Sequence, residues 1–278
     1  MSHLRISAIS FLNTAPLMWD FEHGSAGENF DIFYTVPSAC AADLAAGKAD
    51  IGIIPAAAYT TVPNLVILPG IAIASLRAVR SILLVSKVPV EKIQTVALDT
   101  SSLTSVALVK VLFAKWWGGE RKFTSMAPEL QPMLQQNDAA LLIGDSALQV
   151  DRSQYLTYDL AEEWFRLTGK PFVFAFWAVR KDAIKDKTSN LDLAAIFQQS
   201  RDHGLAPDSL NQIASEWASR VGLSEADVRS YLTDNIHYYL DSAHIEGLGL
   251  YYRFAEECGA LPTAPALDFL ATSKPALI

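Results

Sequence analysis

The chain has 278 residues, 51% of them hydrophobic, which is enough for a large buried core in one or two domains. It carries 22 basic and 30 acidic residues, a formal net charge of −8, and no cluster of lysines or arginines, so nucleic acid is not an expected partner. No apolar run reaches the roughly 18–20 residues that a membrane-spanning helix needs, so no membrane partner is expected either.

Short apolar runs that are typical of buried strands alternate with amphipathic segments along the first two-thirds of the chain. In chain order, the expected strands are residues 5–10, 30–36, 51–54, 66–68, 81–86, 95–98, 139–143 and 172–178. The clearest helices between them are expected at residues 39–47, 103–117 and 161–168. This alternation predicts an α/β fold with largely parallel sheets.

From residue 191 to residue 259 the pattern is helical, with almost no strand signal. Asp208 or Ser209 is expected to cap one helix there, and Gly222 to end it. Ser224 followed by Asp227 is expected to open the next helix. The sequence therefore predicts a helical carboxyl-terminal segment.

Two polar stretches, LLVSKVPVEKIQTVAL and FWAVRKDAIKDKTSN, are interpreted as crossings of the chain between two lobes. On this basis residues 1–90 and 182–278, with the helical tail, form lobe one, and residues 91–181 form lobe two. Two α/β lobes joined by two crossings enclose a central cleft, which is a common place for a small ligand.

Small polar residues follow the ends of several expected strands and lead into helices. Asn13 follows the first strand, Ser38 the second, the run DTSSLTS (99–105) the sixth, and Gly144 and Asp145 the seventh. In open α/β sheets the ligand crevice lies beyond the carboxyl ends of the strands, where helix amino termini favour anions. The pattern therefore predicts a site for a small carboxylate.

Each of these residues could equally be an ordinary helix cap, and Asp145 is better explained as a cap than as a catalytic acid. The hydroxyl run is more informative, because one cap needs only one hydroxyl. Asn13 is the sharpest single candidate, although an Asn at a strand end also fits a turn. Arg77 and Arg80 could pair with a ligand carboxylate or could be solvated, and they are left unassigned.

The sequence lacks the motifs that bind dinucleotides or nucleoside triphosphates, and it has no nucleophile elbow. His237 and His244 could share a helix face as metal ligands, but a core or surface pair is preferred because no acidic third ligand stands at a suitable position. Cys40 and Cys258 have no metal-ligand spacing and are expected to be reduced thiols, with a disulfide as the alternative. No cofactor and no metal are expected.

Six stretches together carry a resemblance to a known family. They are RISAISFLNTAPL, VPSACAADLAAGKADIGIIPAAAY, VRSILLVSK, ALDTSSLTSVALVKVLF, LLIGDSAL and PFVFAFWAVRK. In this order they resemble chorismate dehydratase, the first enzyme of the futalosine route to menaquinone. The resemblance implies a two-lobed fold like that of type II periplasmic binding proteins, with a central cleft and a helical carboxyl-terminal segment.

The resemblance also implies an activity: the dehydration of chorismate to 3-[(1-carboxyvinyl)oxy]benzoate in the cytoplasm, in agreement with an amino terminus that shows no secretory signal. Where relatives have serines after the third strand, this chain has Ala56 and Ala57, so only backbone N–H contacts with a ligand are expected there. The oligomeric state is not assigned. Two alternatives stay open: a non-catalytic binding or sensor protein for a small aromatic acid, and a naphthoate synthase of the same pathway, which would need a mid-chain histidine.

The resemblance to this family also implies roles for the residues at the strand ends. Asn13 and Ser81 are the expected catalytic residues and contact the reacting part of the substrate. The proton is expected to go to the substrate's own enolpyruvyl carboxylate, because the sequence offers no better base. The expected substrate-binding residues are Ser38, Thr100, Ser101, Ser102, Thr104, Ser105, Gly144 and Asp145.

Overall fold

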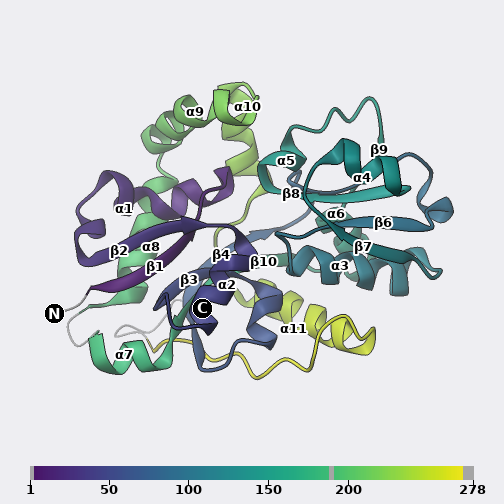
Figure 1. The fold of residues 1–278 in the computed structure, drawn as a ribbon. Helices are drawn as coiled ribbons and strands as arrows, with labels where there is room; N and C mark the ends of the chain where they lie inside the picture. Colours follow the sequence, from purple (N-terminus) through teal and green to yellow (C-terminus); the bar gives the residue numbers. More distant parts are fainter. Residues whose placement is uncertain (1–2, 188–190, 272–278) are drawn as a thin grey trace.

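The computed structural model describes residues 3–187 and 191–271, which form two α/β lobes lying side by side (Figure 1). Each lobe is built on a five-stranded sheet. The first sheet has the order β2-β1-β3-β10-β4, from Phe30–Thr35, Leu4–Ile9, Ile51–Pro55, Phe172–Arg180 and Leu65–Ser75. The second has the order β7-β6-β8-β5-β9, from Lys122–Met126, Thr95–Asp99, Ala139–Ile143, Ile82–Ser86 and Leu156–Asp159. The expected two-lobed α/β fold is confirmed.

Helices and short helical turns follow the strands. Lobe one holds η1 (Leu12–Met18), α1 (Trp19–His23), η2 (Ala26–Asn29), α2 (Pro37–Ala45), η3 (Ala56–Thr60) and α7 (Lys181–Lys187). Lobe two holds η4 (Val90–Lys92), α3 (Thr104–Leu112), η5 (Phe113–Trp117), α4 (Leu130–Gln136), α5 (Gly144–Leu148) and α6 (Leu160–Thr168). The tail holds α8 (Leu193–Gly204), α9 (Pro207–Val221), α10 (Glu225–Ser230), η6 (Tyr231–Asn235) and α11 (Ser242–Glu257).

Both sheets are mixed rather than largely parallel. β1 runs parallel to β2 and β3, and β6 runs parallel to β7 and β8. β5 and β10 run antiparallel to the strands beside them. Each of these is the first strand after the chain passes from one sheet to the other. The chain therefore enters the new sheet at the edge where the neighbouring strands end, and the entering strand runs in the opposite direction to them.

The strand pairing places the two passages between lobes earlier in the chain than the expected division at 90/91 and 181/182. β5 belongs to the second sheet and β10 belongs to the first. We therefore propose that lobe two comprises residues 82–171. The polar stretches after β5 and β10 are surface connections within a lobe, since they continue into η4 and α7.

All the expected strands are present, but β7, β9 and the second half of β4 were not predicted. β7 and β9 are edge strands with exposed or half-buried residues, so they have no apolar run. In β4 the pair Pro69-Gly70 interrupts the run and suggests a turn. The sheet tolerates this proline because β4 is also an edge strand, where a missing ladder donor can face away from the sheet.

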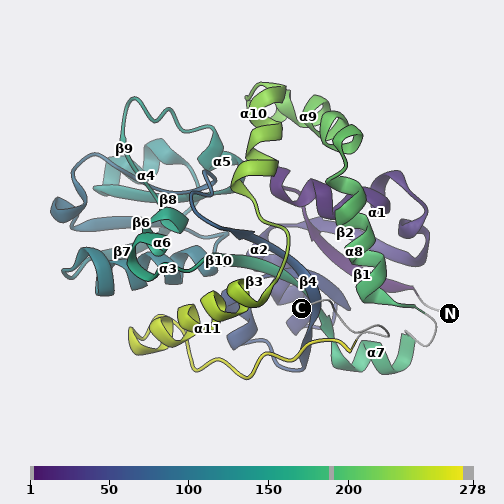
Figure 2. The same ribbon diagram turned by 180° about the vertical axis from the view of Figure 1, so that it is seen from behind.

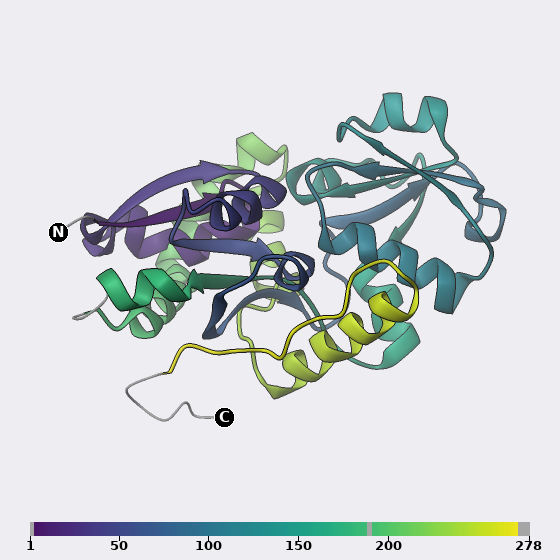
Figure 3. The ribbon, with the colours of Figure 1, turned by 60° about the horizontal axis from the view of Figure 1, so that its bottom comes forward.

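The helical tail packs on both lobes. α9 contacts η1 of lobe one and α5 of lobe two, and α11 contacts β10 and α3. Figure 2 shows α9 and α10 above the junction of the lobes, and Figure 3 shows α11 along their underside. The tail therefore flanks the junction on two sides.

Two of the expected helix ends in the tail are confirmed. The Ser224 hydroxyl accepts from the Asp227 N–H and caps α10, and Gly222 ends α9 in a left-handed conformation. The expected cap by Asp208 or Ser209 is wrong, because α9 begins at Pro207, so both residues lie inside its first turn and the cap position is taken by Ala206. None of the helices in the described part of the chain combines the length and the apolar character needed to span a bilayer.

Candidate functional site

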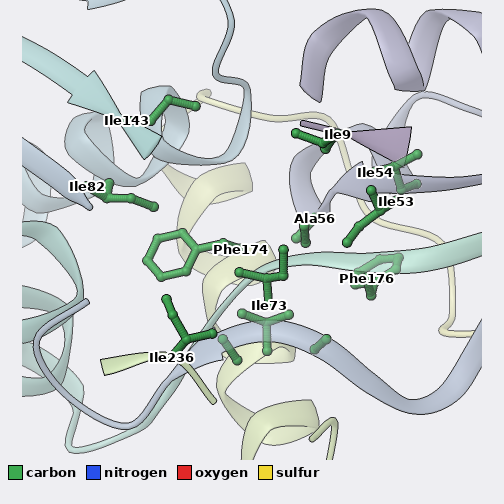
Figure 4. Close-up of a cluster of buried hydrophobic side chains, with 14 of the residues drawn as sticks. Ile9, Ile53, Ile54, Ala56, Ile73, Ile82, Ile143, Phe174, Phe176 and Ile236 are labelled. Atoms are coloured by element: carbon green, nitrogen blue, oxygen red, sulfur yellow. The ribbon is translucent and has the colours of Figure 1, made fainter. Parts of the chain in front are cut away.

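A cavity of about 490 Å³, part of it open to solvent, lies where the strand ends of the two lobes meet. Its walls are largely apolar. Ile9 and Ile73 line it from lobe one, Ile82 and Ile143 from lobe two, and Figure 4 shows the Phe174 ring between these two groups of isoleucines. None of the described residues on its wall is charged. Apolar walls with a few polar groups among them are typical of sites for small organic ligands.

The structure brings half of the predicted site residues to the cavity wall. Those on the wall are Asn13, Ser102, Thr104, Ser105 and Gly144. Those that do not line it are Ser38, Ser81, Thr100, Ser101 and Asp145. The wall residues come from loops after β1, β6 and β8, which lie far apart in sequence and meet because their strands end at the same cleft.

The hydroxyl run after β6 is held in place by its own hydrogen bonds. The Ser101 N–H and hydroxyl both donate to Asp99 Oδ1, at 2.8 and 2.6 Å. The Ser102 hydroxyl accepts from the Ser105 N–H at 3.2 Å, and so caps the first turn of α3. Asp99 is buried, and burial raises the pKa of this carboxyl although the bonds from Ser101 lower it in part. The loop is therefore preorganised.

Thr104 joins lobe two to lobe one. Its buried hydroxyl accepts from the Ala57 N–H at 3.1 Å and donates to the Phe174 carbonyl at 3.0 Å. The Ala57 N–H, which was expected to contact a ligand, therefore binds a protein hydroxyl in this structure. Nearby, the Ser38 N–H donates to the Ser101 carbonyl at 3.2 Å, which is a second bond across the cleft. The two lobes are closed on each other.

Asp145 makes a third bond across the cleft. It lies in the first turn of α5, but Ile143 is the residue that precedes this helix, and no side chain caps it. Instead, Asp145 Oδ1 accepts from the Leu12 N–H at 3.1 Å, where η1 of lobe one begins. Asp145 is thus a cap, as expected, but for a helical turn in the other lobe. Burial raises the pKa of Asp145, while the Leu12 bond and the charge of Arg220 lower it in part.

Ser81 lies fully buried directly before β5, at the end of the passage from β4, and is held from three directions. Its carbonyl accepts from the Gly144 N–H at 2.8 Å, and its hydroxyl accepts from the Tyr231 hydroxyl at 2.8 Å. The two preceding N–H groups, of Val79 and Arg80, donate to the carboxylate of Asp159 at 3.1 and 2.7 Å. Arg80 has a φ of 64°, a strained value that this clamp maintains.

Four side chains that hydrogen-bond to residues of the cleft were missed by sequence reasoning. Asp159 also caps α6, and its spacing to Glu162 is a capping pattern that the sequence does display. Tyr231 has no such signal. In α11, the Tyr251 hydroxyl donates to the Thr104 carbonyl of lobe two, and the Tyr252 hydroxyl donates to the Ala56 carbonyl of lobe one. These pairings depend on the packed tail.

Asn13 lines the cavity, where its side-chain oxygen accepts from the Thr14 hydroxyl at 3.3 Å. Arg77 points elsewhere: it is 64% exposed, pairs with Glu162 at 3.7 Å and lies over the Phe165 ring. Arg77 is therefore accounted for without a ligand.

His237 and His244 do have an acidic neighbour, contrary to the expectation. Asp241 Oδ1 lies 2.7 Å from His244 Nδ1 and accepts from the His244 N–H as the cap of α11. The two imidazoles stack at 4.3 Å between centroids and 4° between planes. One ring nitrogen of each histidine and one Asp241 carboxylate oxygen all lie within 4.8 Å of one another, so the three side chains form a group that could hold a metal ion.

Comparison with known proteins gives consistent results. A family model described as menaquinone biosynthesis matches residues 4–257. A relative from Thermus thermophilus, named chorismate dehydratase, is 30% identical over 273 residues, which cover 92% of this chain and 94% of the relative.

Solved structures share the fold at low sequence identity. A protein from Archaeoglobus fulgidus has a TM-score of 0.72 at 16% identity, over 93% of this chain and 98% of its own. The periplasmic aliphatic sulphonate-binding protein of Escherichia coli has a TM-score of 0.65 at 18% identity, over 96% of each chain. The two-lobed arrangement is therefore that of a periplasmic binding protein.

Proposed function

Because the chain belongs to the menaquinone biosynthesis family, we propose that it dehydrates chorismate to 3-[(1-carboxyvinyl)oxy]benzoate. The observation that carries the proposal is the likeness to the Thermus thermophilus chorismate dehydratase, which extends over nearly the whole of both chains. The cavity supports it, since it has apolar walls against which a ring can pack and polar groups from the strand ends.

The reaction needs positioning more than strong acid–base catalysis. A ring C–H bond breaks and its electron pair forms a ring double bond. The neighbouring C–O bond breaks with its pair on oxygen, which leaves as water after taking up a proton. The ring becomes aromatic, which supplies a large driving force. The remaining tasks of the protein are to hold one conformer and to stabilise developing charge.

We assign Asn13 and Ser81 to the reacting part of the substrate, with Ser81 fully buried and off the cavity wall in this closed arrangement. The Asn13 amide lines the cavity, and it would orient the leaving hydroxyl, because a neutral amide is a poor base. None of the described histidines lies on the cavity wall. We therefore assign the proton to the substrate's own enolpyruvyl carboxylate. A large loss of activity in any His→Ala variant that still folds and binds would contradict this assignment.

We assign the two substrate carboxylates to Ser38 and to the hydroxyl run from Thr100 to Ser105, with Gly144 and Asp145 as further substrate-binding residues. In the closed arrangement the Ser38 N–H is already bonded to the Ser101 carbonyl. The lobes must therefore part to admit the substrate, and a carboxylate would then take over such N–H groups. Cys40 and Cys258 are free cysteines, which supports a reducing compartment and hence our proposal that the protein is cytoplasmic.

The test is to incubate the purified protein with chorismate and to follow absorbance and product mass. We expect the loss of one water at a rate proportional to enzyme. Asn13→Ala should slow this at least about tenfold, the equivalent of about 1.4 kcal/mol. Asn211→Ala, on the exposed face of α9, is the matched control and should leave the rate unchanged. Chorismate that stays intact but raises the melting temperature would favour a binding protein, as the fold alone permits.

A further inference from the structure

The Tyr231 hydroxyl is a buried group that no part of the proposed reaction yet uses. Tyr231 opens η6 in the helical tail, and its side chain is fully buried. Its hydroxyl donates to Ser81 Oγ at 2.8 Å, across 150 residues of sequence. The Asn13 side chain also lowers the pKa of the same hydroxyl in part. One phenol thus interacts with both residues assigned to the reacting part of the substrate.

The direction of this hydrogen bond matters for Ser81. Burial raises the pKa of Tyr231, and the bond with Ser81 and the nearby Asn13 side chain offset this only in part, so the phenol is protonated at neutral pH. Its single proton is donated to Ser81 Oγ. Ser81 then keeps its own proton to donate onward, and a donor that itself accepts a hydrogen bond is polarised and strengthened.

The backbone around Ser81 is held by hydrogen bonds that do not orient the Ser81 hydroxyl. The carbonyl is fixed by the Gly144 N–H, and the preceding backbone is fixed by Asp159. Tyr231 is the protein group that fixes the hydroxyl itself among the described hydrogen bonds. The fold thereby uses a residue of the tail to complete a site made by the two lobes.

We propose that Tyr231 is a positioning residue that orients the Ser81 hydroxyl and the Asn13 amide toward the departing hydroxyl of the substrate. This rests on the proposed dehydration. Tyr231 takes and gives no proton in the net reaction. It acts by setting which way the Ser81 proton points.

The experiment compares Tyr231→Phe, Ser81→Ala and the double variant with the wild type in chorismate turnover. Tyr231→Phe removes one oxygen and keeps the ring. We expect kcat to fall about tenfold and KM to stay within about twofold, because the lost interaction orients the reacting group rather than holding the carboxylates. In the Ser81→Ala background, Tyr231→Phe should cause no further fall, because the two hydroxyls act as one unit.

Tyr238→Phe is the matched control. Tyr238 is also buried, and its hydroxyl has no hydrogen-bond partner among the described residues. Its loss should leave kcat unchanged. A merely structural role of Tyr231 would predict lower stability with unchanged kcat of the folded protein, and that result would overturn the proposal. An equal fall on both the wild-type and the Ser81→Ala backgrounds would also overturn it.

A second variant covers the case in which Tyr231→Phe does not fold. Replacement of Tyr231 by 3-fluorotyrosine keeps the ring and the hydroxyl but makes the phenol a stronger donor. A measurable change in kcat at constant KM supports the positioning role, and an unchanged kcat overturns it. If the wild type itself leaves chorismate intact, the proposed function fails. If the wild type turns chorismate over and the Tyr231 variants keep its kcat, only the role of Tyr231 fails, so the two failures are distinguishable.

Discussion

Gly144→Ala probes the contact between the lobes at the cavity. Gly144 has a φ of 60°, and a Cβ there would lie 2.9, 3.0 and 3.2 Å from three atoms of the Phe11 ring in the opposite lobe. The left-handed backbone costs a non-glycine residue roughly 1–2 kcal/mol. Forcing a methyl group against the ring costs about 1–3 kcal/mol more. We expect the free energy of unfolding to fall by about 2–5 kcal/mol in total.

Gly169→Ala separates the two contributions. Gly169 has a φ of 69°, but a Cβ there would meet no atom within 4 Å, so only the backbone cost applies. Urea unfolding of both variants should show Gly144→Ala to be the less stable by about 1–3 kcal/mol. Adding Phe11→Ala to each background should abolish this difference. Equal stabilities of the two glycine variants would refute the reasoning and would indicate that the lobes are apart without ligand.

Three further predictions concern buried or capping polar groups. Burial raises the pKa of Asp138, but hydrogen bonds from the backbone and from Thr95 outweigh it and hold the pKa below its usual value. The ionised group thus stabilises the fold above the unfolded-state pKa of about 3.9, and this is lost as pH falls through the lower folded pKa. Asp138→Asn should therefore be less stable than the wild type at pH 7, with the gap closing in acid, and a pH-independent gap in urea unfolding would contradict this. Thr104→Val should destabilise by about 2–4 kcal/mol, since it leaves a buried N–H and a buried carbonyl without partners, whereas Thr104→Ser keeps both bonds and should stay near wild type in thermal unfolding. Asp159→Ala should lower stability by about 1–3 kcal/mol by uncapping α6, and should also slow turnover by releasing the backbone before Ser81; unchanged turnover in the folded variant would rule out the second effect.

The sequence by itself determined the features that depend on local pattern. Continuous apolar runs located the central strands, because a strand buried on both faces has no polar positions. Ser224 and Gly222 located helix ends, because a cap bonds to an N–H two or three residues away, and because glycine adopts the left-handed conformation without strain. Polar residues at strand ends located part of the cavity wall, including Asn13 and Gly144, because strands of an α/β sheet end at a common edge.

Only the tertiary structure decided which polar groups meet. Asp145 has the sequence context of a local cap, yet it bonds to the N–H of Leu12, 133 residues away. The polar stretches after β5 and β10 suggested that the chain changes lobe there. The strand pairing shows that it has already done so, because β5 belongs to the second sheet and β10 to the first. Tyr231 reaches Ser81 because the tail packs across the junction of the lobes. A buried hydroxyl needs a partner, but its identity depends on how distant segments pack, and no spacing along the chain encodes that.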